Sequence, residues 1–155
     1  MNIILISGQN DTGKTQSCFF IQKILQQKSF KQIYSSSDIS SGNFFKAYTG
    51  FNKKQKQVNI LINSESDFIG SGKRLQQYLQ INKNTDIVIT TIRDIENLRT
   101  NIENVLKPYC TSTDIIEIPL AKITRKIKFN DSYKWYKNAI ENLLKFIIEH
   151  APFDL

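Results

Sequence analysis

The sequence predicts an α/β fold: a three-layer sandwich on a mostly parallel sheet, with one antiparallel β-hairpin. Three observations support this prediction. An unbroken apolar run at residues 3–6 is typical of a strand that is covered on both faces. Strand-like and helix-like segments then alternate along the chain. Two segments rich in aromatic and apolar residues, 44–51 and 58–63, flank a polar turn and indicate the hairpin.

Length and composition suit one domain, 1–155, with a full core, because 40% of the 155 residues are hydrophobic. No apolar run approaches the roughly 20 residues of a membrane helix, and the N-terminus lacks the basic lead of a signal peptide. Cys18 and Cys110 offer neither a disulfide framework nor a zinc site, and the single histidine, His150, disfavours a histidine-based triad. We therefore expect a cytoplasmic protein without membrane contact.

The first half of the chain is predicted to run from strand to helix to hairpin. A strand over 2–6 leads into a glycine-rich turn, and a helix over 14–28 follows, in which apolar residues recur at helical spacing. A short strand is expected at 31–34. The serine-rich stretch 35–42 is predicted to be a loop by its composition. Residues 52–55 supply the polar turn of the hairpin.

The second half is predicted to alternate helix and strand. A helix over 71–81 is followed by a buried strand over 86–91, and a helix over 94–106 ends before Pro108. A strand over 114–118 precedes the last helix, which begins near Asp131 or Ser132. That helix carries one apolar stripe, which is expected to pack against the sheet: Tyr136, Ile140, Leu143, Leu144 and Ile147.

Residues 8–15, GQNDTGKT, match the pattern G-x-x-x-x-G-K-[ST] at every fixed position, between a predicted strand and a predicted helix. Glycines let the backbone wrap closely around phosphate, and the loop N–H groups and the helix N-terminus attract anions. Lys14 would bridge the β- and γ-phosphates, and Thr15 would complete a magnesium shell. The motif predicts that ATP and Mg²⁺ bind at Gly8, Gln9, Asn10, Asp11, Thr12, Gly13, Lys14, Thr15 and Gln16.

Asp11 is an unusual residue inside such a loop. A carboxylate near triphosphate is repelled unless it points away or is neutralised. Two interpretations follow. The side chain either points outward and stabilises the turn of the loop, or it contacts the substrate above the γ-phosphate.

An acidic cluster follows the 58–63 strand. Ligands bind at the carboxyl ends of strands in open α/β sheets, so this cluster is a candidate magnesium site. Asn63 stands where an Asp usually closes the apolar run, which leaves Glu65 and Asp67 as displaced candidates. The alternative role for Asp67 is to cap the next helix.

Two further polar clusters follow predicted strands. After the 86–91 strand, Arg93 could stack on adenine or balance phosphate charge, while Asp94 caps the next helix. Asp38, in the serine-rich stretch, could act as a catalytic base, as in kinases that phosphorylate small hydroxyls. The alternative for that stretch is an ordinary solvated connection.

The net charge of +7, from 21 basic and 14 acidic residues, favours anionic partners. Two basic stretches contribute to it. Lys53, Lys54 and Lys56 lie at the hairpin. The second stretch precedes the last helix and contains Lys122, Arg125, Lys126 and Lys128. Each stretch is either a contact for phosphate or nucleic acid, or simply solvated charge.

The stretch 1–25 resembles the small P-loop NTPase and kinase superfamily, through its Walker A motif. Over residues 1–95, GQNDTGKT, then a hairpin closing on VNILINSESD, then DIVITTIRD resemble small bacterial and phage P-loop ATP-binding proteins. By this resemblance Asp67 takes the acidic position and Arg93 the arginine position. Ser66 stands where a glycine is usual, and Glu65 adds a second acid.

Two functions are compatible with these features. The first is a kinase-like phosphotransferase that acts on a small molecule such as a nucleoside or nucleotide. Lys14, Asp67 and Arg93 would be its catalytic residues, with Thr15 and Asp67 at the metal. The alternative is a regulatory NTPase that hydrolyses ATP slowly, or only binds it, and contacts a protein or nucleic-acid partner through its basic surface.

Overall fold

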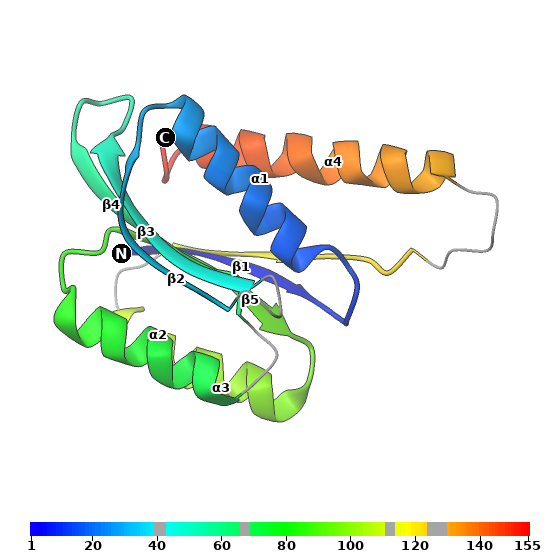
Figure 1. The fold of residues 1–155 in the computed structure, drawn as a ribbon, viewed down its shortest axis with the longest axis horizontal. Coiled ribbons are helices and arrows are strands. Elements are labelled where there is room, and N and C mark those ends of the chain that lie inside the picture. Colours follow the sequence, from blue (N-terminus) through cyan, green and yellow to red (C-terminus); the bar gives the residue numbers. More distant parts are fainter. Residues whose placement is uncertain (39–42, 66–68, 111–113, 124–129) are drawn as a thin grey trace.

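The computed structural model describes residues 1–38, 43–65, 69–110, 114–123 and 130–155 (Figure 1). The strands within these residues are β1 (Asn2–Gly8), β2 (Lys31–Asp38), β3 (Asn43–Phe51), β4 (Gln57–Asn63), β5 (Ile87–Arg93) and β6 (Ile115–Pro119). The helices are α1 (Lys14–Gln27), α2 (Ile69–Ile81), α3 (Glu96–Leu106), the 3-10 turn η1 (Lys107–Tyr109) and α4 (Asn130–Glu149). None of the helices in this part of the chain is long and apolar enough to span a bilayer.

The described strands form one sheet, in the order β2-β3-β4-β5-β1-β6, and most of its pairings are parallel. β1 lies between β5 and β6 and is parallel to both, and β4 is parallel to β5. β3 is the exception, because it runs antiparallel to both β2 and β4. The β3–β4 pair is the predicted hairpin. These pairings confirm the α/β class and the mostly parallel sheet.

Helices cover both faces of the sheet and make three layers, with α1 and α4 on one face and α2 and α3 on the other (Figure 1). Successive side chains of a strand point to opposite faces. In β1, Ile4 and Ile6 therefore pack in the core beneath α1 and α4, whereas Ile3 and Leu5 pack in the core beneath α2 and α3. Burial from both sides explains the unbroken apolar run of β1.

Several strands extend further than the sequence predicts, and β1 continues to Gly8. Residues 35–38 belong to β2 rather than to a loop, because β2 pairs with β3 as far as Asp38 opposite Asn43. Residues 92 and 93 belong to β5, because it pairs with β1 as far as Arg93 opposite Gly8. In β2, satisfying the backbone donors and acceptors outweighs a polar composition that favours a loop, whereas in β5 the added Ile92 is a buried core residue.

Cys18 is a core residue of the layer formed by α1. Its side chain is fully buried, and burial raises the pKa of its thiol to about 12. The thiol therefore stays protonated and is not available as a nucleophile.

The parallel strands end at one edge of the sheet, and the chain between β1 and α1 turns at this edge. The turn between β3 and β4 lies at the opposite edge (Figure 1). Ligand sites in open α/β sheets lie at the carboxyl edge, so the turn after β1 lies where a ligand site is expected.

Candidate functional site

The 8–15 loop contains two glycines that are needed for different reasons. Gly13 has φ 93° and ψ 16°, in the left-handed region that suits glycine, and a Cβ there would meet no atom within 4 Å. Gly8 also has a positive φ, 152°, and at this residue space is limiting as well. A Cβ would lie 2.7 Å from Thr12 Oγ1 and 3.0 Å from the carbonyl oxygen of Leu120. The loop is therefore both tightly curled and closely packed against the segment after β6.

Lys14 supplies the positive charge of the loop. Its Nζ donates hydrogen bonds to the carbonyl oxygens of Gly8, at 2.9 Å, and Gln9, at 2.7 Å. Thr12 tightens the same curve, because its hydroxyl donates to the Gln9 carbonyl at 3.0 Å. Only 8% of Lys14 is exposed. The ammonium group is thus fixed inside the curve of the loop, where it needs little reordering to meet an anion.

The N-terminus of α1 opens at the same place. The first N–H groups of a helix lack partners within the helix and carry a partial positive charge. Gly13, the N-cap, has no side chain with which to satisfy them, and the first turn of the helix contains no acidic residue. These donors and Lys14 together make a site that attracts anions.

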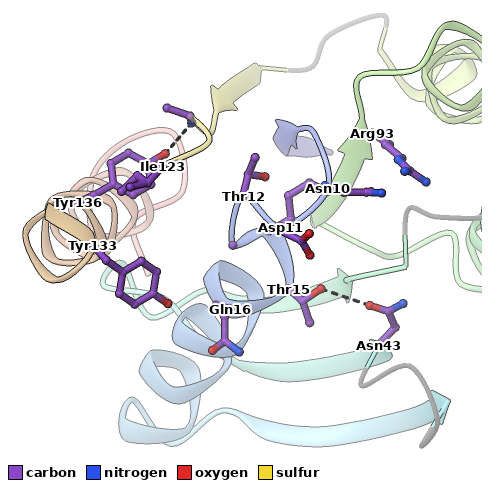
Figure 2. A pocket seen from close by; sticks show the side chains of 13 residues that line it. Asn10, Asp11, Thr12, Thr15, Gln16, Asn43, Arg93, Ile123, Tyr133 and Tyr136 are labelled. Carbon is purple, nitrogen blue, oxygen red and sulfur yellow. Dashed lines mark hydrogen bonds between the residues drawn. The ribbon is translucent and has the colours of Figure 1, made fainter. Parts of the chain in front are cut away.

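A cleft of about 520 Å³ opens beside the loop (Figure 2), within the usual size range of small-molecule sites. Four parts of the chain line it: the loop with the first turn of α1, the start of β3, the end of β5, and residues that follow β6 together with residues of α4. The lining residues are 10–16, Asn43, Arg93, Ala121, Ile123, Tyr133 and Tyr136.

The structure brings most of the predicted binding residues together. Of residues 8–16, all except Gly8 and Gln9 line the cleft, and those two contribute the carbonyl groups that hold Lys14. Asp11 has φ 60°, is exposed and lines the cleft (Figure 2). This position favours contact with a ligand over a side chain that points away from it.

Arg93 also lies where the sequence predicts it to act. It is the last residue of β5 and lies opposite Gly8 in the parallel pairing with β1. Neighbouring strands are separated by about 4.8 Å, so the Arg93 backbone lies directly beside the start of the loop. Its side chain lines the cleft together with Lys14, which places two cationic residues in one site.

Of the acidic candidates, Glu65 stands apart from this cleft. Glu65 is 2% exposed, and its Oε1 lies 2.6 Å from Nη1 of Arg74 in α2. Asn63 is buried and donates to Thr90 Oγ1 at 3.1 Å. β5 separates both residues from β1. Asp67 lies outside the described residues. Asp38, the last residue of β2, lies opposite the cleft residue Asn43 in the pairing of β2 with β3.

Several cleft residues are not predicted from the sequence. Asn43 begins β3, and its Oδ1 accepts a hydrogen bond from Thr15 Oγ1 at 3.2 Å. Tyr136 is predicted to pack against the sheet, but it lines the cleft, and its hydroxyl accepts a hydrogen bond from the Ala121 N–H at 2.7 Å. Tyr133 and Ile123 lie beside it (Figure 2). No local pattern marks these residues, because their position depends on tertiary packing.

The hairpin lysines lie away from the cleft. Lys53 donates to the carbonyl of Glu149, Lys54 pairs with Asp154, and Lys56 lies 3.8 Å from Asp86. These lysines therefore contact neighbouring parts of the chain at the opposite edge of the sheet. Of the second basic stretch, Lys122 is described, whereas Arg125, Lys126 and Lys128 lie outside the described residues.

Comparison with known proteins leaves the family of this chain open. No family model and no curated protein matches the sequence. A solved structure described as "Crystal structure of APE1195" aligns with 97% of this chain and 77% of its own length, with a TM-score of 0.43 and 13% identity. A TM-score of this size supports no argument about the site. The resemblance to P-loop NTPases therefore stays a prediction from the motif.

Proposed function

We propose that the cleft binds a nucleoside triphosphate, ATP, with Mg²⁺, and that the 8–15 loop holds the phosphates in the manner of a P-loop NTPase. The observation that carries this proposal is the Lys14 ammonium group, which two loop carbonyls fix beside the N-terminus of α1. A chain of phosphates is the ligand that this set of donors suits best, because it offers several anionic oxygens to several N–H groups.

The nucleoside would lie toward Tyr133, Tyr136 and Ile123. These residues gather on one side of the cleft, whereas Arg93 and Asn43 lie on the other (Figure 2). Aromatic rings provide a stacking surface for any base. This arrangement would leave the terminal phosphate on the side of Arg93.

The residues near the loop also suit Mg²⁺. Thr15 and Asn43 present oxygen atoms, the ligand type that Mg²⁺ prefers. Magnesium usually keeps several waters and takes further ligands from phosphates, so few protein ligands are needed. When bound, it would neutralise phosphate charge. Within the described residues, no cluster of three or more His, Cys, Asp or Glu side chains offers an alternative metal site. Asp67 remains the acidic ligand that the sequence proposes.

The reaction we propose is phosphoryl transfer to a small acceptor such as a nucleoside or nucleotide. Lys14 and Arg93 would stabilise the charge that develops on the transferred group. Incubation with labelled ATP and a panel of nucleosides, nucleotides and small hydroxy acids tests this reaction. We expect label on one acceptor, and a loss of about a thousandfold in rate for Arg93→Gln. Label that never leaves ATP in the presence of any acceptor would exclude the transfer.

One observation favours a second function, a nucleotide-dependent interaction protein. α4 lines the cleft with Tyr133 and Tyr136, and it also exposes 71% of Trp135 and 61% of Phe146. Large exposed aromatic side chains are typical of interaction surfaces. A helix with both features would link occupancy of the cleft to a protein or nucleic-acid partner. In the same assay, ATP binding without transfer would support this function.

A further inference from the structure

We infer that Asn43 is a positioning residue that orients the Thr15 hydroxyl toward Mg²⁺. This inference rests on the proposed nucleotide site and extends it to a residue that the glycine motif does not include. Asn43 comes from a different part of the sheet, at the first position of β3. A role for Asn43 would mean that the fold contributes to the metal site in addition to the glycine motif.

The geometry places the two side chains in direct contact. Thr15 is the second residue of α1, and its Oγ1 donates a hydrogen bond to Asn43 Oδ1 at 3.2 Å (Figure 2). Both residues line the cleft, next to Gly13 and Lys14. The antiparallel pairing of β3 with β4 holds Asn43 at the carboxyl edge of β4, which is the edge where the loop lies.

The hydrogen bond matters because a hydroxyl has one proton and two lone pairs. When Thr15 Oγ1 donates its proton to the Asn43 carbonyl oxygen, its lone pairs point away from Asn43. They are then available to a cation in the cleft. Without an acceptor the hydroxyl rotates, and the proton can point at the cation. Magnesium demands near-octahedral geometry, so this orientation affects its affinity strongly. Partners that orient a metal ligand commonly contribute 10–100-fold to metal affinity.

Asn43 suits this role better than Glu65, the acidic residue that follows β4. Glu65 is buried and paired with Arg74 in α2, on the other side of the sheet from α1. A neutral amide oxygen can accept the Thr15 proton without adding a negative charge beside the phosphates. The structure therefore points to an amide, and not a carboxylate, as the partner of Thr15.

The test compares Asn43→Leu, which removes the acceptor oxygen at nearly constant size, with Asn43→Asp, which keeps an oxygen there. The matched control is Asn59→Leu, because Asn59 is also half-buried but bonds to the Asn84 carbonyl near the other end of β4. Binding of ATP is measured by calorimetry in excess Mg²⁺ and in EDTA. The difference between the two affinities reports the metal alone.

We expect Asn43→Leu to reduce the gain in ATP affinity from Mg²⁺ about tenfold, and to leave the affinity in EDTA within about twofold. Asn59→Leu should keep the gain. Asn43→Asp should keep or increase it, because a carboxylate also accepts the Thr15 proton and its charge favours a nearby cation. In a double-mutant cycle, Asn43→Leu should add little to Thr15→Val, because both remove the same interaction.

Two results would overturn the inference in different ways. If the wild-type protein bound no ATP, the proposed function would fail and the inference with it. If the wild-type protein bound ATP with a gain from Mg²⁺, and folded Asn43→Leu kept that gain, only the role of Asn43 would fail. If Asn43→Leu does not fold, Asn43→Asp provides the test, because it keeps an acceptor oxygen. A loss of the Mg²⁺-dependent gain in ATP affinity as large in Asn43→Asp as in Thr15→Val would then overturn the role of Asn43.

Discussion

Single residues determine the shape of the 8–15 loop. Gly13 permits a positive φ, and Gly8 permits both a positive φ and a close approach between two parts of the chain. The Lys14 ammonium group donates hydrogen bonds to the carbonyl groups that point inward in this loop. A change at either glycine should therefore disturb the loop, but for distinct physical reasons.

This difference can be measured in the free energy of unfolding. Gly13→Ala should lower it by about 1–2 kcal/mol, because an L-residue is strained in the left-handed region. Gly8→Ala should lower it by about 1–3 kcal/mol through overlap with Thr12 and the Leu120 carbonyl, in addition to the strain of its positive φ. Urea denaturation of the two variants gives both values.

A second substitution separates strain from overlap. Thr12→Ala removes the atom nearest to the added methyl group of Gly8→Ala, so part of the loss should be recovered in the double variant. Thr12→Ala should recover nothing in Gly13→Ala, since a methyl group there meets no neighbour. Equal recovery in both backgrounds would contradict this account of the loop.

At the scale of elements, one ion pair connects α3 to β6 below the loop. Arg99 of α3 donates to both carboxylate oxygens of Glu117 in β6, at 3.1 and 2.7 Å. The Arg99 hydrogen bond lowers the pKa of Glu117, against an opposing effect of burial, and a hydrogen bond with Ser7 lowers it further. The pair therefore holds two elements together next to the end of β1.

The pair should make stability depend on pH. Because the folded pKa of Glu117 lies below its ordinary value of 4.5, the stabilisation is complete above that value and is lost as the pH falls through the folded pKa. Glu117→Gln should have a lower free energy of unfolding than the wild-type protein at pH 7. On acidification to pH 3, its free energy of unfolding should fall by less than that of the wild-type protein. Both side chains are about one-third exposed, so a modest effect is expected.

Glu103→Gln is the matched control for this prediction. Glu103 also pairs with Arg99, at 2.9 Å, but both residues belong to α3, so the pair connects no separate elements. Urea denaturation across this pH range should show a smaller change for Glu103→Gln than for Glu117→Gln. The reverse order would contradict a structural role for the α3–β6 pair.

The elements differ in how well the sequence predicts them. The loop and α1 are predictable because their signals are local: fixed glycines, Lys14, and apolar residues at helical spacing. The end of β2 is not, because the pairing of Ser35–Asp38 with β3 is a tertiary contact that composition does not encode. Leu144 is buried as predicted, but Leu143 of the same predicted stripe is 43% exposed, and Ile148 is buried in addition.

At the scale of the whole molecule, the cleft is assembled from distant parts of the chain. β3 contributes Asn43, β5 contributes Arg93, and α4 contributes Tyr133. Arg93 is predictable because parallel strands end at one edge, and it is confirmed as a neighbour of the loop. Asn43 and Tyr133 are not, because they reach the cleft through a reversed strand and through the packing of the last helix.

The aromatic side of the cleft gives a prediction for the base. Tyr133→Ala should weaken ATP binding about tenfold, because a stacked base contributes about 1–3 kcal/mol, and should leave binding of inorganic triphosphate unchanged. Trp135→Ala is the control on the same helix, since Trp135 is exposed and does not line the cleft. Equal losses for ATP and triphosphate would place the base elsewhere.

The central claim is that the 8–15 loop and its ammonium group hold a polyphosphate. Calorimetry with ATP and Mg²⁺, on the wild-type protein and on Lys14→Ala, tests it most directly, with circular dichroism to show that both are folded. We predict a saturable heat of binding for the wild-type protein and none for the folded variant. No heat from the wild-type protein, or an unchanged affinity in Lys14→Ala, would contradict the claim.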